Sequence, residues 1–265
     1  MQHIINSAKE VAVQVIREAG LIAKERFDTL STINVKDEYG DVVTEVDFQC
    51  EAVILKAINE HFPEHQIRSE EAGSNNKESD WLWMIDPLDG TNNYAISLPI
   101  FAISITLIYQ KVPVLGVVYE PMTDRLFVTS IGEGSYCNDK AISVKESTNV
   151  HRANLGWIQG HGVQNDVKAV QLRNHIDTHC KRMMRLWAPT LQWCMLARGD
   201  LDGIVLYNSE GDDLYSGILM VKEAGAIVID FNGNPFTEMM EEPYLIACHP
   251  AHQEYFMKLV EEGLS

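Results

Sequence analysis

Two aspartates in the segment WMIDPLDGTNNY, residues 83–94, have the clearest chemical potential in this chain. Asp86 and Asp89 lie three residues apart directly after an apolar run, and Pro87 restricts the backbone between them. Two carboxylates held this close repel each other unless a cation neutralises them. Hard oxygen ligands of this kind suit Mg²⁺. A solvated turn is the alternative interpretation, because short motifs also occur by chance.

The residues after Asp89 suggest a place for a phosphate group. Gly90 permits backbone angles that other residues avoid, so a helix could begin directly after it. The backbone N–H groups of Gly90, Thr91 and Asn92 would then face outward at a helix start, where anions bind.

Three further segments carry acids that could join such a site. RSEEAG (68–73) supplies Glu70 and Glu71, DVVTEVD (41–47) supplies Asp47, and EGDDLYSGILMVKEAGA (210–226) supplies Asp213. Each has an ordinary alternative: a glutamate pair is commonly solvated surface, and an aspartate is favoured at a helix start.

Composition limits the partners. The chain has 265 residues, with 38 Asp and Glu against 21 Lys and Arg, and a formal net charge of −17. This balance argues against a nucleic acid partner, which needs clustered basic residues. A small anionic substrate is compatible with it only if the chain recruits cations.

Cysteine and histidine usage points away from zinc and disulfides. The five cysteines are scattered and form no CxxC pair, which is typical of unpaired thiols in a reducing cytoplasm. The nine histidines have no metal-ligand spacing and are expected to be structural or on the surface. No targeting segment or membrane span is expected.

The elements that must position these residues can be read from hydrophobic periodicity. Apolar residues recur at helical spacing over 4–23, and a second helix is expected after Val43, with Thr44 and Asp47 as a capping box and Pro63 at its end. β-branched and aromatic runs then predict strands at 81–85, 100–109, 112–120 and 125–130.

The second half alternates strand and helix patterns. Strands are expected at 153–158, 182–186, 203–207, 226–230 and 244–248, and helices at 164–177, 189–198, 213–224 and 251–262. Gly225 is expected to stop the third of these helices. The fold class is therefore α+β in alternating layers. The change of pattern near residue 150 predicts an N-terminal subdomain, 1–150, and a C-terminal subdomain, 151–265.

Together, the four acidic segments resemble the inositol monophosphatase family of Mg²⁺-dependent, lithium-sensitive phosphatases. WMIDPLDGT matches the family's D-P-[IL]-D-G-T signature, and DVVTEVD, SEEAG and DDLYS…EAGA follow the family order. The resemblance covers nearly the whole chain and implies an α-β-α-β-α sandwich of the sugar-phosphatase type.

The resemblance also implies a role for individual residues. Glu70, Asp86 and the Leu88 carbonyl resemble the ligands of a first metal, and Asp86, Asp89 and Asp213 those of a second. Two or three Mg²⁺ ions per site are expected. Asp47 matches the carboxylate that pairs with Thr91 to polarise the attacking water, which Glu70 also orients. The implied substrate-binding residues are Glu70, Leu88, Asp89, Gly90, Thr91, Arg185 and Asp213, and Lys36 matches a lysine near the metals.

Departures from the family pattern concern the substrate. Asp212 replaces the usual Trp before the last metal ligand, and Leu206 stands where many inositol-specific members carry a Glu that contacts ring hydroxyls. Glu210 is near but out of register. In RLWAPT (185–190), Arg185 is kept, whereas Trp187 replaces a small residue and could narrow the pocket or stack on a ring.

The predicted function is Mg²⁺-dependent hydrolysis of inositol monophosphate, or of a similar small sugar phosphate, by a metal-activated water. A phosphatase for fructose 1,6-bisphosphate, NADP or a 3′-phosphonucleotide on the same fold is an alternative. So is a regulatory protein that binds a partner and has incidental phosphatase activity. The resemblance further implies a homodimer, and the scattered cysteines favour a cytoplasmic location.

Overall fold

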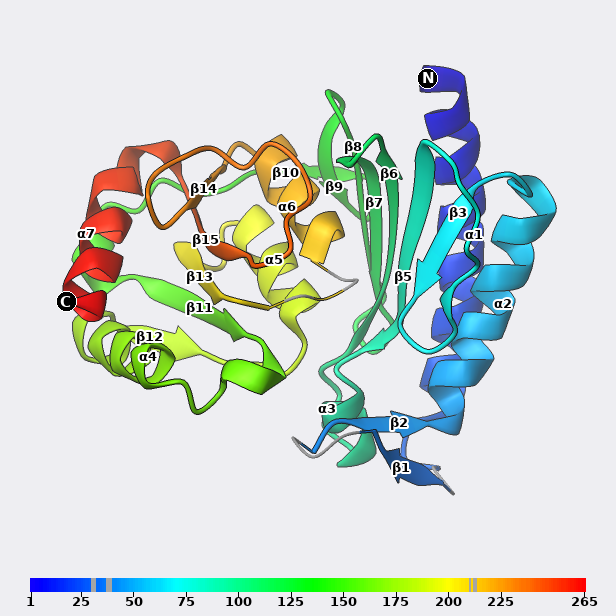
Figure 1. The fold of residues 1–265 in the computed structure, drawn as a ribbon, viewed down its shortest axis with the longest axis horizontal. Helices are drawn as coiled ribbons and strands as arrows, with labels where there is room; N and C mark the ends of the chain where they lie inside the picture. Colours follow the sequence, from blue (N-terminus) through cyan, green and yellow to red (C-terminus); the bar gives the residue numbers. More distant parts are fainter. Residues whose placement is uncertain (30–31, 37–39, 210, 212–213) are drawn as a thin grey trace.

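The computed structural model describes residues 1–29, 32–36, 40–209, 211 and 214–265. Helices and sheets alternate in five layers, as Figure 1 shows from one end of the molecule to the other. The layers run helix pair, eight-stranded sheet, helix pair, five-stranded sheet, helix pair. This order confirms the layered α+β class.

Two long helices form the first layer. α1 (Gln2–Arg26) buries one apolar stripe against the sheet, and α2 (Glu45–His61) packs beside it. Thr44 caps α2 as predicted: its backbone N–H donates to Asp47 Oδ2 at 2.9 Å, and its hydroxyl oxygen accepts from Val46 N–H at 3.1 Å. A capping box therefore fixes the position of Asp47.

The larger sheet has the strand order β10-β9-β8-β7-β6-β5-β3-β4. Neighbouring strands are antiparallel except β3 and β5, which run parallel. The strands are β3 (Gln66–Ser69), β4 (Gly73–Ser74), β5 (Trp81–Asp89), β6 (Ala102–Tyr109), β7 (Val112–Glu120), β8 (Arg125–Ser130), β9 (Gly134–Cys137) and β10 (Lys140–Ile142).

Two short helices separate the sheets. α5 (Pro189–Ala197) and α6 (Leu214–Glu223) pack against each other, and α6 also packs on β7 and β8. Trp193 is fully buried in this middle core. Gly225 follows α6 at φ +94°, which confirms it as the helix stop.

The smaller sheet and two outer helices complete the fold. Its order is β12-β11-β13-β15-β14. β11 (Asn154–Gln159) pairs parallel with β12 (Arg182–Met184) and with β13 (Gly203–Tyr207), whereas β14 (Ile227–Asp230) and β15 (Tyr244–Cys248) are antiparallel. α4 (Val167–His179) and α7 (Gln253–Leu264) cover the outer face.

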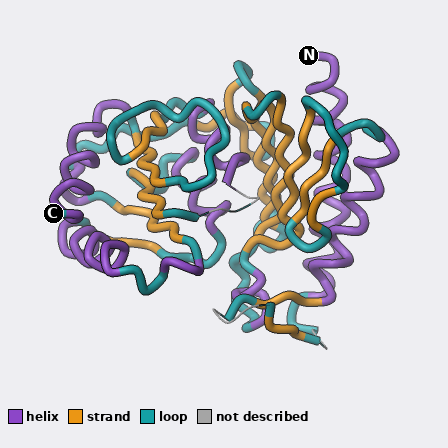
Figure 2. The backbone as a smooth tube through the Cα atoms, in the orientation of Figure 1, coloured by secondary structure: helices purple, strands orange, loops and turns teal. Residues whose placement is uncertain are grey.

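Several short elements were not expected from the sequence. A two-stranded hairpin of β1 (Ile33–Val35) and β2 (Val42–Thr44) lies next to α3 (Thr91–Ala95), below the larger sheet in Figure 2. Three 3₁₀ turns, Val150–Arg152, His161–Val163 and Pro250–His252, join elements of the second half. None of them has enough residues to produce a periodic hydrophobic pattern.

One boundary differs in a way that matters for the site. The sequence predicts that the strand ends at Ile85, but β5 continues to Asp89, with a shift of register against β6 between Asp86 and Asp89. Pro87 lies within this irregularity, where no ladder hydrogen bond from its nitrogen is needed.

The two sheets lie on either side of the boundary predicted near residue 150. Strands of the larger sheet lie within 66–142 and those of the smaller sheet within 154–248. The division into two subdomains stays a prediction. All five cysteines are unpaired, as expected. Among the helices that the structure describes, none is long and apolar enough to cross a membrane.

Candidate active site

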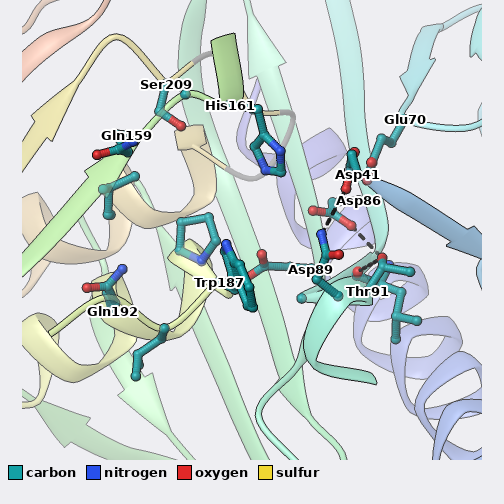
Figure 3. Close-up of a pocket in the computed structure, with 18 of the residues that line it drawn as sticks. Asp41, Glu70, Asp86, Asp89, Thr91, Gln159, His161, Trp187, Gln192 and Ser209 are labelled. Atoms are coloured by element: carbon teal, nitrogen blue, oxygen red, sulfur yellow. Dashed lines mark hydrogen bonds between the residues drawn. The ribbon is translucent and has the colours of Figure 1, made fainter. Parts of the chain in front are cut away.

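A pocket of about 1060 Å³ lies where the two sheets approach each other. In Figure 3, Glu70, Asp86, Asp89 and Thr91 lie on the side of the larger sheet, and Gln159, Gln192 and Ser209 lie on the opposite side. The structure thus brings the first three acidic segments, 41–47, 68–73 and 83–94, to one place.

The end of β5 supplies two buried carboxylates. Asp86 is 7% exposed and Asp89 is 4% exposed, and both line the pocket. Asp86 Oδ1 accepts the backbone N–H of Leu88 at 3.0 Å, and Asp89 Oδ2 accepts that of Thr190 at 2.8 Å. One local and one distant backbone donor therefore hold the two carboxylates in defined orientations.

Gly90 allows β5 to turn directly into α3. Its φ is +98°, a left-handed conformation that L side chains rarely adopt. A Cβ at this position would lie 2.9 Å from the carbonyl oxygen of Ile100 and 3.2 Å from that of Trp187. A glycine is therefore required both by the turn and by the close approach of two backbones.

Thr91 and Asp47 form a buried hydrogen-bonded pair. Thr91 Oγ1 lies 2.9 Å from Asp47 Oδ1 and 2.8 Å from the carbonyl oxygen of Leu88, so its one hydroxyl proton has two acceptors. Burial raises the pKa of the Asp47 carboxyl, and hydrogen bonds from Thr44 and Thr91 oppose that effect. Asp47 is thus a better proton acceptor than a solvated aspartate. The same residue belongs to the capping box at the start of α2.

Glu70 and Glu71 follow β3 and share a lysine. The backbone N–H of Glu70 donates to the Ile85 carbonyl at 3.1 Å, which ties this segment to β5. Lys36 Nζ donates to Glu70 Oε1 at 2.7 Å and also to Glu71 Oε1. Burial raises the pKa of Glu71 to about 7, although the hydrogen bond from Lys36 opposes the shift. Burial alone would lower the pKa of Lys36, but the two carboxylates raise it.

The donor set fits a hard divalent cation. Glu70, Asp86, Leu88 and Asp89 all line the pocket and offer only oxygen ligands. Asp213, Asp212 and Glu210 lie outside the described residues. Within the described part of the chain, no three or more His, Cys, Asp or Glu side chains are already placed to hold a metal ion. Lys36 instead provides positive charge at Glu70.

The opposite wall carries amide, hydroxyl, imidazole and indole side chains. Gln159, His161, Gln192 and Ser209 line it together with Trp187, whose indole is 62% exposed and whose φ is +50°. In the view of Figure 3, Trp187 lies between Gln192 and Asp89. Arg185, the predicted substrate contact, also lines the pocket.

Leu206 does not take part in the pocket. It is fully buried in β13, within the apolar core between the sheets. The position where inositol-specific members carry a glutamate is therefore part of the core, and Ser209 is the nearest described pocket-lining residue along the chain.

Several lining residues were not predicted from the sequence. Asp41, Arg68, Gln159, His161 and Ser209 were not expected there, and His161 was expected to be structural or on the surface. A partial signal existed for two of them: Gln159 ends β11 and Ser209 follows β13, and ligands commonly bind beyond the carboxyl ends of parallel strands. The others carry no signal that separates them from ordinary loop residues.

Comparison with known proteins agrees with this arrangement. The sequence profile of the inositol monophosphatase family matches residues 5–265. A Pasteurella multocida protein named Nus factor SuhB is 32% identical over 98% of each chain. A fructose-1,6-bisphosphatase/inositol-1-monophosphatase of Aquifex aeolicus is 32% identical over 86% of each chain. The structure of an inositol monophosphatase from Anabaena superimposes with a TM-score of 0.85 at 26% identity, covering 97% of this chain and 96% of that one.

The layered fold, the acidic pocket and these relatives define the class of the protein, a phosphoric monoester hydrolase. Within that class, the chain belongs to the inositol monophosphatase family, since the family match spans almost the whole sequence.

Proposed function

We propose that this pocket hydrolyses inositol monophosphate, or a similar small sugar phosphate, in the presence of Mg²⁺. The observation that carries the proposal is the Thr91–Asp47 hydrogen bond beside the carboxylates of Asp86 and Asp89. It places a hydroxyl with a buried proton acceptor next to oxygen ligands suited to a cation. These are the parts that hydrolysis by water requires.

We infer that two or three Mg²⁺ ions bind here when the protein is loaded. Glu70, Asp86, Asp89, the Leu88 carbonyl and Asp213 would hold them. Bound Mg²⁺ supplies Lewis-acid stabilisation of the charge on the phosphate and on the leaving oxygen.

The chain's own residues then have separate tasks. When Thr91 donates its proton to Asp47, its oxygen lone pairs can accept a hydrogen bond from the attacking water. The water oxygen forms the new bond to phosphorus, its proton passes toward the Thr91–Asp47 pair, and the bond to the leaving oxygen breaks. The backbone N–H groups of Gly90 and Thr91 hold phosphate oxygens, and Glu70 orients the water.

Two residues, Leu206 and Trp187, bear on the choice of substrate. Leu206 is buried and offers no contact to ring hydroxyls, whereas Trp187 presents an aromatic face to the pocket. Fructose 1,6-bisphosphate, NADP and 3′-phosphonucleotides therefore stay as alternatives on the same chemistry. The Aquifex relative carries both fructose-1,6-bisphosphatase and inositol-1-monophosphatase in its name.

Further proposals rest on the family, on the scattered cysteines and on the change of sequence pattern near residue 150. We propose lithium-sensitive activity, a homodimer, a cytoplasmic location, and subdomains 1–150 and 151–265. We propose catalysis, and not the regulatory binding of a partner, as the main role, although the Pasteurella relative is named a Nus factor. The reason is that a pure binding module has no need for the Thr91–Asp47 pair.

The test is a panel of phosphate monoesters assayed with Mg²⁺, with and without lithium, on the wild type and on Asp86→Asn. We expect Asp86→Asn to lower turnover by about 100-fold or more, because several kcal/mol of charge stabilisation depend on the cation. Asp139→Asn, at an exposed turn between β9 and β10, is the matched control. Near-wild-type turnover in Asp86→Asn would overturn the assignment.

A further inference from the structure

Glu51 is a buried carboxylate that the proposed mechanism does not use. It lies on α2 and is 5% exposed. Its Oε1 accepts three hydrogen bonds: from Ser69 Oγ at 2.5 Å, from Ala72 N–H at 2.9 Å and from Glu71 N–H at 3.2 Å. One oxygen atom therefore gathers donors from a segment eighteen to twenty-one residues away.

These three donors surround Glu70 along the chain. Ser69 ends β3, and residues 70–72 leave the sheet toward the pocket. Glu70 itself is tied by its backbone N–H to Ile85 and by its side chain to Lys36. Glu51 thus holds the Ser69 side chain before Glu70 and the backbone after it, while the Glu70 side chain lines the pocket.

The same helix holds the Thr91 side of the site. Asp47 and Glu51 are four residues apart on α2, so their side chains lie on one face, one turn from each other. Asp47 bonds Thr91, and Glu51 bonds the Glu70 segment. One rigid helical turn therefore sets the distance between these two parts of the site.

A buried carboxylate costs more free energy than a neutral side chain that would link the same two segments. In return, hydrogen bonds to an ionised acceptor are about twice as strong as neutral ones. Strong hydrogen bonds of this kind hold the segment in which the Glu70 and Glu71 side chains share Lys36.

We propose that Glu51 is a positioning residue that fixes the Glu70 segment in the geometry needed for cation binding. The proposal rests on the proposed function, in which Glu70 is a cation ligand. Glu51 lies outside the pocket lining, so it acts through the Ser69 hydroxyl and the backbone N–H groups of Glu71 and Ala72.

The first test compares Glu51→Gln with the wild type by calorimetric titration with Mg²⁺ and by hydrogen exchange of the Glu71 and Ala72 amides in metal-free protein. A glutamine keeps the size and one acceptor oxygen but loses the charge. We expect the Mg²⁺ dissociation constant to rise about 10- to 100-fold, as for other residues that orient metal ligands. We also expect faster exchange at the two amides, and a substrate KM at saturating Mg²⁺ that changes much less.

The matched control is Glu223→Gln. Glu223 also accepts two backbone amides, from Gly132 at 2.9 Å and Gly134 at 3.0 Å, at the turn between β8 and β9. It lies outside the pocket lining, so we expect this variant to keep wild-type Mg²⁺ affinity. An equal loss of affinity in both variants would show a general effect of stability and would overturn the proposal. Wild-type affinity and exchange in Glu51→Gln would overturn it as well.

A second variant covers the case in which Glu51→Gln does not fold. Ser69→Ala removes one donor from the other partner and leaves α2 intact. We expect a smaller rise of the Mg²⁺ dissociation constant in the same direction, and an unchanged constant would contradict the proposal. If the wild type binds Mg²⁺ but hydrolyses no monoester, the proposed function fails, whereas the binding and exchange results still decide the role of Glu51.

Discussion

At the residue scale, the site depends on side chains whose orientation is fixed by hydrogen bonds with neighbouring groups. The Thr91 hydroxyl has only one proton for Asp47 and the Leu88 carbonyl. Asp89 is oriented by an amide from another part of the chain, that of Thr190. The residue types and their spacing predicted the acids at 47, 70, 86 and 89, but spacing says nothing about which backbone groups orient them.

Thr91→Ala should lower kcat by about 100-fold and leave KM for the substrate within a few fold. The methyl group cannot pass a proton to Asp47, and proton transfer of this kind contributes about 10²- to 10⁴-fold. Steady-state kinetics at saturating Mg²⁺ would measure the split. Thr91→Ser, which keeps the hydroxyl, should recover most of kcat; equal losses of kcat and affinity in Thr91→Ala would indicate a binding role alone.

Trp187→Ala should lower kcat/KM for the best substrate of the panel by about 2- to 10-fold, mainly through KM. Trp187 is exposed and lines the pocket, and an aromatic contact with a ring of the substrate would contribute about 0.5–1.5 kcal/mol. Ile96→Ala is a suitable control, since Ile96 is 66% exposed but does not line the pocket. A rise of kcat/KM for every substrate would mean that the indole obstructs the pocket instead.

At the element scale, local signals predicted most of the framework. Thr44 and Asp47 predicted the start of α2, and Gly225 predicted the end of α6. Both signals are local, because the capping residues themselves favour a helix end. The continuation of β5 to Asp89 was not predictable, since a proline argues against a strand unless the partner's register is known. The β1–β2 hairpin was missed because three-residue strands carry no periodicity.

Gly90→Ala should destabilise the fold more than Gly132→Ala, a change at another turn. Both positions have positive φ, so both alanines cost about 1–2 kcal/mol of backbone strain. Only at Gly90 would the new Cβ meet a backbone oxygen at 2.9 Å, whereas nothing lies within 4 Å at Gly132. Urea denaturation would give the two free energies of unfolding. Equal values would show that β5 and α3 accommodate the methyl group.

At the scale of the whole molecule, the pocket exists only because two sheets and the helices between them pack in one arrangement. The α+β class could be predicted from the alternation of patterns, and the layer order from the resemblance to a family. The residues of the opposite wall could not, because Gln159, Gln192 and Ser209 come from separate elements whose approach depends on the packed middle core.

Mg²⁺ should raise the thermal unfolding midpoint, because a ligand that binds only the folded protein stabilises it. At a concentration 100 times the dissociation constant the gain is about 2.7 kcal/mol. Differential scanning calorimetry with Mg²⁺ or with EDTA would measure it, with NaCl at matched ionic strength as the control for screening of the −17 charge. The shift should vanish in Asp86→Asn; a full shift in that variant would mean that the stabilising ions bind elsewhere.

The hydrogen bond from Thr190 to Asp89 joins residues 101 positions apart. A chain leaves the ribosome from its amino end, and domains generally fold in that order. The acids of β5 are therefore synthesised well before Arg185, Trp187 and the rest of the facing wall. A growing chain, or one truncated before residue 185, carries acids without the wall that would enclose a substrate. Such a chain also lacks the Thr190 amide that orients Asp89, so the carboxylates of β5 take their described arrangement only after α5 has been synthesised.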